Sequence, residues 1–229
     1  MVDKGQIKRY FAIGDIHGCL LHLERLMEKI RGLVNPEEDA LVFMGDYIDR
    51  GPEPKGVIDL LLKIREEFPH MICLLGNHED MFLRWVLTGK DLELYLYNGG
   101  GVTIRSYSSG GKFILPSEHL DFLNSLLPYY ETENYLFVHA GLKPGIPLKE
   151  QALFDLLWIR EEFIRSAEDF GRKVIFGHTP FHQPYIDHNK IGIDTGAVFG
   201  GALTCLELPA ERFYSVAPPW EEGSPLGAM

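Results

Sequence analysis

Apolar runs that end in a glycine and a polar side chain recur along the first third of the chain at equal spacing. The runs 10–13, 40–44 and 71–75 are followed by Gly14-Asp15, Gly45-Asp46 and Gly76-Asn77. The polar residues of successive runs are 31 positions apart, which is close to the length of one βαβ unit, roughly 30 residues. The pattern therefore predicts three parallel strands whose carboxyl ends carry oxygen ligands, the place where open α/β sheets bind their ligands.

Helical periodicity separates these strands, and the alternation resumes later in the chain. We expect helices over 18–32, over 57–68 and from about residue 79, a short helix over 116–127 and a long amphipathic helix over 148–169. Further strands are expected at 135–138, 173–176, 190–193 and 202–208. The Gly- and Ser-rich stretch 97–115, with its centre at 98–112, favours a mobile loop. We expect one α/β domain spanning 1–229, with 210–229 as a C-terminal tail.

Composition narrows the classes of partner. The chain has 229 residues, a formal net charge of −11 and only three cysteines. An acidic chain without a basic stripe argues against nucleic acid as a partner. No apolar stretch reaches the length of about 18 residues that a membrane span needs, so no membrane partner is expected. The sparse, odd number of cysteines favours a reducing compartment and a cytoplasmic location.

Six side chains that can bind metal ions close predicted strands. They offer carboxylate, amide and imidazole donors, and they are Asp15, His17, Asp46, Asn77, His139 and His178. We expect all six on one edge of one sheet, with Asp46 able to bridge two ions through its two oxygens. A mixed nitrogen and oxygen set suits manganese, iron, zinc or similar divalent ions better than calcium.

Five short motifs resemble those of a known family when they are taken together and in order. They are Gly14-Asp15-Ile16-His17-Gly18, Gly45-Asp46-Tyr47-Ile48-Asp49-Arg50-Gly51, Gly76-Asn77-His78-Glu79, His139-Ala140-Gly141 and Gly177-His178-Thr179-Pro180. This set is similar to the phosphoprotein phosphatase family of calcineurin-like metallophosphoesterases, in its bacterial and phage branch. The resemblance implies a β-sandwich flanked by helices, with a dimetal site at the carboxyl ends of the strands.

The resemblance also implies roles for individual residues. Asp15, His17 and Asp46 would hold one ion, and the other would be held by Asp46, Asn77, His139 and His178. Mn²⁺ is the expected metal, with iron, zinc or nickel as alternatives. Such a pair of ions supports direct in-line attack by a bridging hydroxide on the phosphorus.

Four further residues are expected to act on the substrate. His78 would be the general acid for the leaving alkoxide, and Asp49 would orient that histidine. Arg50 is the expected phosphate clamp, because guanidinium binds phosphate through two hydrogen bonds. Arg160 resembles a second phosphate-binding arginine of the bacterial branch. We expect Asp194, in the sequence that follows the last histidine motif, to form a turn rather than to be a seventh ligand.

These residues predict a phosphomonoesterase that acts on serine/threonine phosphoproteins or phosphopeptides, or one of dual specificity. An alternative is a symmetrical diadenosine tetraphosphate hydrolase with the same site. Asp49 and Glu79 favour the protein phosphatase, because such hydrolases usually lack an acid at the first position and often carry Asp at the second. The chain also offers few extra cations, with Arg105 and Lys112 as candidates. A non-catalytic metal-binding scaffold is the second alternative, but it should lack a ligand or the acid.

Overall fold

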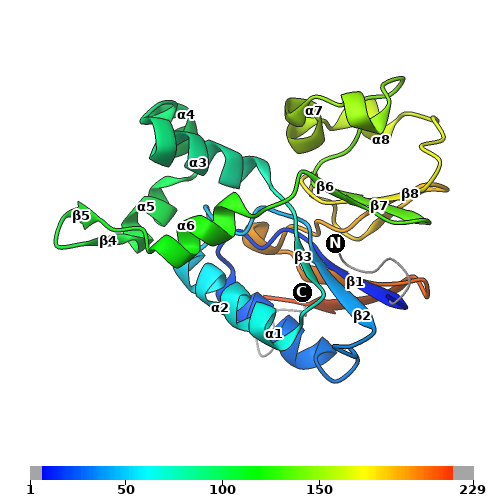
Figure 1. The fold of residues 1–229 in the computed structure, drawn as a ribbon, viewed down its shortest axis with the longest axis horizontal. Coiled ribbons are helices and arrows are strands. Elements are labelled where there is room, and N and C mark those ends of the chain that lie inside the picture. The colour runs from blue at the N-terminus through cyan, green and yellow to red at the C-terminus, as the bar shows by residue number, and fades with distance from the viewer. Residues whose placement is uncertain (1–6, 219–229) are drawn as a thin grey trace, which may run out of the picture.

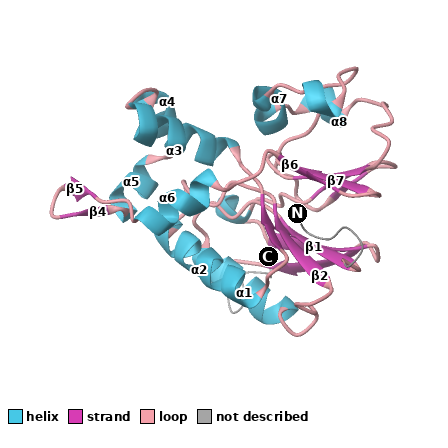
Figure 2. Ribbon diagram, in the orientation of Figure 1, coloured by secondary structure: helices cyan, strands magenta, loops and turns pink. Residues whose placement is uncertain are grey.

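Two β-sheets form the centre of the computed structural model, which describes residues 7–218 (Figures 1 and 2). The first sheet has the order β12 (Arg212–Val216), β11 (Leu203–Leu208), β1 (Arg9–Ile13), β2 (Asp39–Phe43) and β3 (Met71–Cys73). The second has the order β6 (Tyr129–Glu131), β7 (Tyr135–Val138), β8 (Lys173–Phe176), β10 (Lys190–Gly192) and β9 (Tyr185–Ile186). A hairpin of β4 (Ser108–Ser109) and β5 (Lys112–Phe113) stands apart.

Helices lie outside both sheets (Figure 1). Those that follow the first three strands are α1 (Leu20–Ile30), α2 (Pro54–Glu67) and α3 (Asn77–Thr88). The middle of the chain forms α4 (Leu92–Tyr97), α5 (Gly101–Ser106) and α6 (Ser117–Asn124), and the second sheet carries η1 (Leu148–Glu150), α7 (Leu153–Trp158) and α8 (Glu161–Ile164). A last single turn, η2 (Ala197–Phe199), precedes β11. The expected sandwich of two sheets flanked by helices is therefore confirmed (Figure 1).

Strands β2 and β11 of the first sheet are buried on both faces. In β2, Ala40 and Val42 belong to an apolar cluster shared with the second sheet, whereas Leu41 and Phe43 pack with the cluster that includes α1 and α2. Because neighbouring side chains of a strand point to opposite faces, a strand covered on both sides has no polar face. This explains why the chain shows continuous apolar runs at 40–44 and 71–75.

Strands β1, β2 and β3 are parallel, as the equal spacing predicts. Strands β7 and β8 are also parallel to each other but belong to the second sheet. The prediction that all six metal-binding candidates lie on one edge of one sheet is therefore wrong. They come from two sheets whose strand ends meet at the same rim, because hydrophobic spacing reports where strands end and not which sheet they join.

The expected helix over 148–169 is wrong, because this stretch is divided into η1, α7 and α8. The Leu156 carbonyl, which would accept from the Arg160 amide in a continuous helix, accepts instead from the Ala140 amide at 2.9 Å. Ile159 then takes an extended conformation, and the chain turns before α8 begins. The apolar periodicity continues across this break because Leu157 and Phe163 are both buried.

The mobile loop expected over 97–115 is also wrong, since this stretch carries the end of α4, α5 and the β4–β5 hairpin. Gly99 has φ of +98° and makes the turn between the two helices. A Cβ at Gly100 would lie 2.4 Å from the Tyr95 ring, so a close contact requires this glycine. Glycine here reflects tight packing between helices.

Part of the expected tail 210–229 is a strand. β12 pairs antiparallel with β11 and forms the edge of the first sheet. Pro209 and Pro218 flank this strand and leave its hydrogen bonds to β11 intact. Residues 219–229 of the expected tail lie outside the described part. Within residues 7–218, no helix is long and apolar enough to cross a membrane.

The buried Lys190 fastens the end of α8 to the second sheet. Its Nζ donates to the carbonyls of Phe163, Ile164 and Ser166 at 3.1, 3.0 and 2.6 Å. Lys190→Met keeps the length of the side chain but leaves these carbonyls without their donor. We expect it to lower the free energy of unfolding by about 1–3 kcal/mol, measured by urea denaturation.

Lys29→Met is the matched control, because the exposed Lys29 also donates to one backbone carbonyl, that of Ser215. Its effect should stay within about 0.5 kcal/mol. Equal effects of the two substitutions would show that Lys190 does not anchor α8.

Candidate metal centre and active site

Six side chains gather where strands of the two sheets end. Asp15 and His17 follow β1, Asp46 follows β2, and Asn77 begins α3 after β3. The second sheet supplies His139 after β7 and His178 after β8. Each of the six is at most 5% exposed, so all the donors predicted from the sequence lie in one buried cluster.

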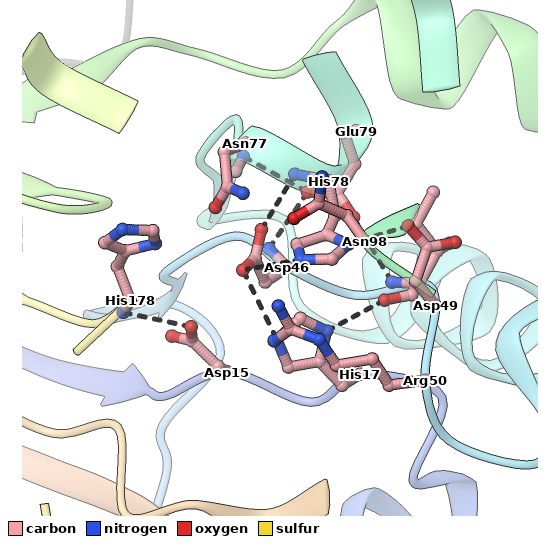
Figure 3. Close-up of polar contacts among 12 residues, drawn as sticks. Asp15, His17, Asp46, Asp49, Arg50, Asn77, His78, Glu79, Asn98 and His178 are labelled. Carbon is pink, nitrogen blue, oxygen red and sulfur yellow. Dashed lines mark hydrogen bonds and ion pairs between the residues drawn. The ribbon is translucent and has the colours of Figure 1, made fainter. Parts of the chain in front are cut away.

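Asp46 lies at the centre of this cluster (Figure 3). Its Oδ2 is 3.3 Å from His17 Nε2, and its Oδ1 is 3.4 Å from His139 Nε2. Two groups of possible ligand atoms thus share this carboxylate: Asp46 with His17 and His78, and Asp46 with His139 and His178. The geometry fits one bridging carboxylate between two metal positions.

Hydrogen bonds prepare two imidazoles to be ligands. His17 Nδ1 donates to the Ile48 carbonyl at 3.0 Å, and His139 Nδ1 donates to the Met44 carbonyl at 2.8 Å. A proton fixed on Nδ1 leaves Nε2 with the lone pair that can bind a metal ion, which is how outer partners orient metal-binding histidines. In His17 this Nε2 accepts from Arg50 Nη1 at 2.7 Å. Asn77 Oδ1, a further acceptor, lies 3.0 Å from His139 Nε2.

The charge of the cluster favours cations. Burial, and next the charge of Asp194, raises the pKa of Asp15 well above its usual range. Burial also raises the pKa of Asp194 to about 6 and that of Glu79 to about 7. Burial alone would lower the pKa of His139, but Asp46 beside it raises it to about 9. The buried carboxylates therefore stabilise positive charge beside them, whether it is carried by protons or by metal ions.

Two possible ligand atoms of this cluster are buried without a hydrogen bond in the described part of the chain. Asp15 Oδ1 and His178 Nε2 have no hydrogen-bond partner among residues 7–218. Carboxylate oxygens, an amide oxygen and imidazole lone pairs that converge in a buried space suit two divalent ions. The residues present therefore fit the dimetal site that the motifs imply.

Asp49 and His78 form a buried pair beside this cluster. His78 Nδ1 donates to Asp49 Oδ2 at 2.7 Å, and both side chains are fully buried. The opposite ring nitrogen, Nε2, is directed toward Asp46, with 4.0 Å to its Oδ2. This arrangement leaves His78 able to exchange a proton on the side of the metal cluster.

Arg50 and Arg160 both lie close enough to the cluster to interact with its charged side chains. Arg50 Nη1 donates to His17 Nε2 at 2.7 Å, and its guanidinium stacks on the ring of Phe199 at 5.6 Å. Burial lowers the pKa of Arg160, whereas Asp194 and Asp15 attract its charge. Arg160 precedes α8 rather than lying on a continuous helix. The structure thus brings both predicted arginines to the site.

Left-handed backbone concentrates at this site. Five of its residues have φ between +45° and +70°: His17, Asp46, Asp49, Arg50 and His178. Such conformations are uncommon outside glycine and usually persist where surrounding contacts hold them. We infer that these turns keep an uncommon backbone conformation because it directs their side chains into the site.

Glu79 joins the turn that follows β2 to the turn that precedes α3. Its carboxylate accepts from the amides of Asp46, Tyr47 and Ile48 at 2.9, 2.8 and 3.2 Å, and from Gly76 at 3.1 Å. Glu79 is fully buried, so its side chain is occupied with the backbone. These contacts do not bear on the substrate class, so the expectation that Glu79 favours the protein phosphatase stays a prediction. Sequence alone could not reveal these bonds.

Two hydroxyls that the sequence analysis did not single out reach Asp49. Tyr95 Oη and Thr103 Oγ1 donate to Asp49 Oδ1 at 2.6 and 2.5 Å. They come from α4 and α5, and only Thr103 lies in the stretch 97–115 that was expected to be a loop. Asp194 forms the expected turn, since its Oδ1 accepts from the Gly196 amide at 2.9 Å.

Comparison with known proteins identifies the family of the chain. The family model described as calcineurin-like phosphoesterase matches residues 8–203. The serine/threonine-protein phosphatase 1 of Salmonella typhimurium is 34% identical over 211 residues, which cover 88% of this chain and 92% of that protein. The asymmetrical bis(5'-nucleosyl)-tetraphosphatase PrpE of Bacillus thuringiensis is 29% identical over 234 residues, covering 91% and 94%.

Solved structures share the fold at lower identity. A structure described as that of a candidate diadenosine tetraphosphatase has a TM-score of 0.73 at 23% identity and covers 94% of this chain and 96% of its own. A serine/threonine phosphatase from Saccharomyces cerevisiae has a TM-score of 0.67 at 17% identity, covering 94% and 82%. Similarity at this identity supports the fold alone.

A substitution at Gly76 tests whether close packing fixes the position of the Asp46 carboxylate. A Cβ at this position would lie 2.2 Å from Asp46 Oδ1 and 2.3 Å from its amide nitrogen. We expect Gly76→Ala to displace the shared carboxylate and to weaken Mn²⁺ binding at both positions at least tenfold, measured by calorimetry on metal-stripped protein. A displacement of a catalytic group by about 1 Å commonly costs roughly 10²-fold in activity.

Gly32→Ala is the control, because no atom lies within 4 Å of a Cβ built there. It should leave Mn²⁺ affinity unchanged. Wild-type affinity in Gly76→Ala would mean that Asp46 does not need this close approach.

Proposed function

The chain belongs to the calcineurin-like phosphoesterase family, and from that premise we propose that it is a phosphomonoesterase of phosphoproteins. Its substrates would be proteins or peptides phosphorylated on serine or threonine, with dual specificity included. The Salmonella relative that is 34% identical carries the name of such an enzyme. The reaction is hydrolysis of a phosphate monoester by water to give an alcohol and inorganic phosphate.

Two divalent ions belong to the family's chemistry, and six side chains of this chain could hold them. We assign Asp15, His17 and Asp46 to one ion, and Asp46, Asn77, His139 and His178 to the other, with Mn²⁺ as the expected metal. Ions bound there supply Lewis acidity, neutralise the phosphate and lower the pKa of water. Asp46 contributes the geometry, because its Oδ2 faces His17 and its Oδ1 faces His139.

The observation that carries the proposal is the Asp49–His78 pair. A serine or threonine side chain leaves as an alkoxide, which is a strong base and needs a proton as the P–O bond breaks. We assign that proton to His78 Nε2, because Asp49 holds the opposite nitrogen at 2.7 Å. The nucleotide leaving groups of a polyphosphate are far weaker bases and do not need this acid.

The surroundings of Arg50 support a polypeptide substrate. A mostly apolar pocket of 300 Å³ lies beside this arginine, with Leu20, Pro52 and Val198 in its lining. With Arg50 and Arg160 on the phosphate, the pocket suits an uncharged side chain next to the phosphorylated residue. The four phosphates of a dinucleotide would require more cations, and the β4–β5 hairpin places Lys112 at the far end of the helical layer (Figure 1).

Dinucleoside tetraphosphate hydrolysis is the second candidate, because the same site could cleave an anhydride. Relatives at 29% identity carry the name of asymmetrical tetraphosphatases. Symmetrical cleavage of diadenosine tetraphosphate gives two ADP, whereas asymmetrical cleavage gives ATP and AMP. Product analysis therefore identifies the mode of cleavage if this substrate is accepted.

Metal removal tests the catalytic centre. Metal-stripped protein should not hydrolyse p-nitrophenyl phosphate, and Mn²⁺ should restore the activity. Asp46→Asn should lower Mn²⁺ affinity at both positions, because one carboxylate serves both, whereas Asp121→Asn on α6 should behave as wild type. Full activity without metal would refute the dimetal mechanism, and absence of activity with every divalent ion would leave the chain as a metal-binding scaffold.

Substrate preference tests the finer proposal. At matched Mn²⁺, we expect a higher kcat/KM for phosphoserine and phosphothreonine peptides than for diadenosine tetraphosphate. The reason is that the general acid His78 assists only a poor leaving group, such as an alkoxide. Steady-state rates for both substrates, with nucleotides separated by chromatography, provide the measurement. A clear preference for the dinucleotide would favour the second candidate.

A further inference from the structure

Both oxygens of the Asp49 carboxylate are engaged by side chains. Oδ2 accepts from His78 Nδ1 at 2.7 Å, while Oδ1 accepts from Tyr95 Oη at 2.6 Å and from Thr103 Oγ1 at 2.5 Å. Thr103 Oγ1 also accepts from the Asp49 amide at 3.0 Å, so it holds the backbone and the side chain of one residue together. All four residues are fully buried, and solvent does not compete for these bonds.

The two hydroxyls arrive on a segment that encloses the turn at Asp49 and Arg50. Tyr95 belongs to α4 and Thr103 to α5, and between them the Gly99 carbonyl accepts from the Arg50 amide at 3.3 Å. Asp49 and Arg50 have φ of +70° and +65°, a left-handed conformation that needs support from outside the turn. The α4–α5 segment, residues 92–106, supplies that support.

We propose that Tyr95 and Thr103 are positioning residues that direct the general acid through Asp49. The proposal rests on the role given to His78 above. With Oδ1 fixed by two hydroxyls, the carboxylate cannot rotate, and its Oδ2 stays on the axis of the His78 Nδ1–H bond. The ring is then held with Nε2 toward the metal cluster, where the leaving oxygen takes up the proton as the P–O bond breaks.

A role in folding alone would predict a different result from a role in positioning. If the hydroxyls only join α4 and α5 to the core, their loss should reduce activity equally for every substrate, through less folded protein. If they direct the acid, the loss should follow the basicity of the leaving group. Nitrophenolate leaves with little help, whereas an alkoxide needs the proton.

Tyr95→Phe and Thr103→Val remove one hydroxyl each with little change in shape. Each should lower kcat for a phosphoserine peptide about tenfold or more, by analogy with the roughly 10²-fold cost of small misplacements. Each should lower kcat for p-nitrophenyl phosphate less than threefold and leave KM and Mn²⁺ affinity unchanged. Thr103→Ser keeps the hydroxyl and should restore the peptide activity.

Tyr107→Phe is the matched control. This tyrosine follows α5, and its hydroxyl bonds to His119 Nδ1 at 2.7 Å. The Asp49 carboxylate instead accepts from His78, Tyr95 and Thr103. It removes a buried hydroxyl from the same part of the fold, and it should change the two substrates alike. Thermal unfolding of all variants with Mn²⁺ measures any loss of folded protein.

His78→Asn separates failure of this inference from failure of the proposed function. On its own it should lower kcat far more for the peptide than for p-nitrophenyl phosphate, and Tyr95→Phe added to it should cause no further loss. Equal losses on both substrates in His78→Asn would overturn the role of the acid and this inference with it. A leaving-group effect in His78→Asn, but equal losses on both substrates in Tyr95→Phe and Thr103→Val, would overturn the positioning role alone.

Discussion

The shared carboxylate of Asp46 is the constraint around which the two halves of the fold are arranged. Its oxygens face His17 on the first sheet and His139 on the second, at 3.3 and 3.4 Å. Several buried acidic side chains surround this point, and they can coexist only where histidines, arginines and cations balance them. Packing of the two sheets brings the imidazoles of the second sheet close enough to share this carboxylate.

Backbone contacts make that position precise. Glu79 binds the amides on both sides of the gap between Asp46 and Gly76, and Gly76 itself leaves no room for a Cβ beside the carboxylate. Gly177 plays the same part on the second sheet, since its Cβ would lie 2.1 Å from Asp15 Oδ1. The glycines that precede Asp15, Asp46, Asn77 and His178 are therefore explained by the close approach of neighbouring loops.

Much of this centre could be predicted because strand ends are local features of a sequence. Apolar runs located β1, β2, β7 and β8 to within one residue, and the residues that follow them are the metal-binding candidates. The break at Ile159 could not be predicted, because it depends on a carbonyl taken by the distant Ala140. The same holds for Tyr95 and Thr103, whose partner Asp49 lies about fifty residues earlier and is joined to them only by tertiary packing.

The α4–α5 segment contributes contacts to Asp49 and Arg50 that strand ends alone do not provide. Strand termini and tight turns can place metal ligands, since each ligand needs only a fixed direction at the rim. An acid that must meet a leaving oxygen needs its ring orientation fixed as well, and that takes partners from a third direction. The helices that follow α3 provide them, through Asp49 Oδ1 and the Arg50 amide. Sequence changes in this segment could thus alter leaving-group preference while the metal centre stays the same.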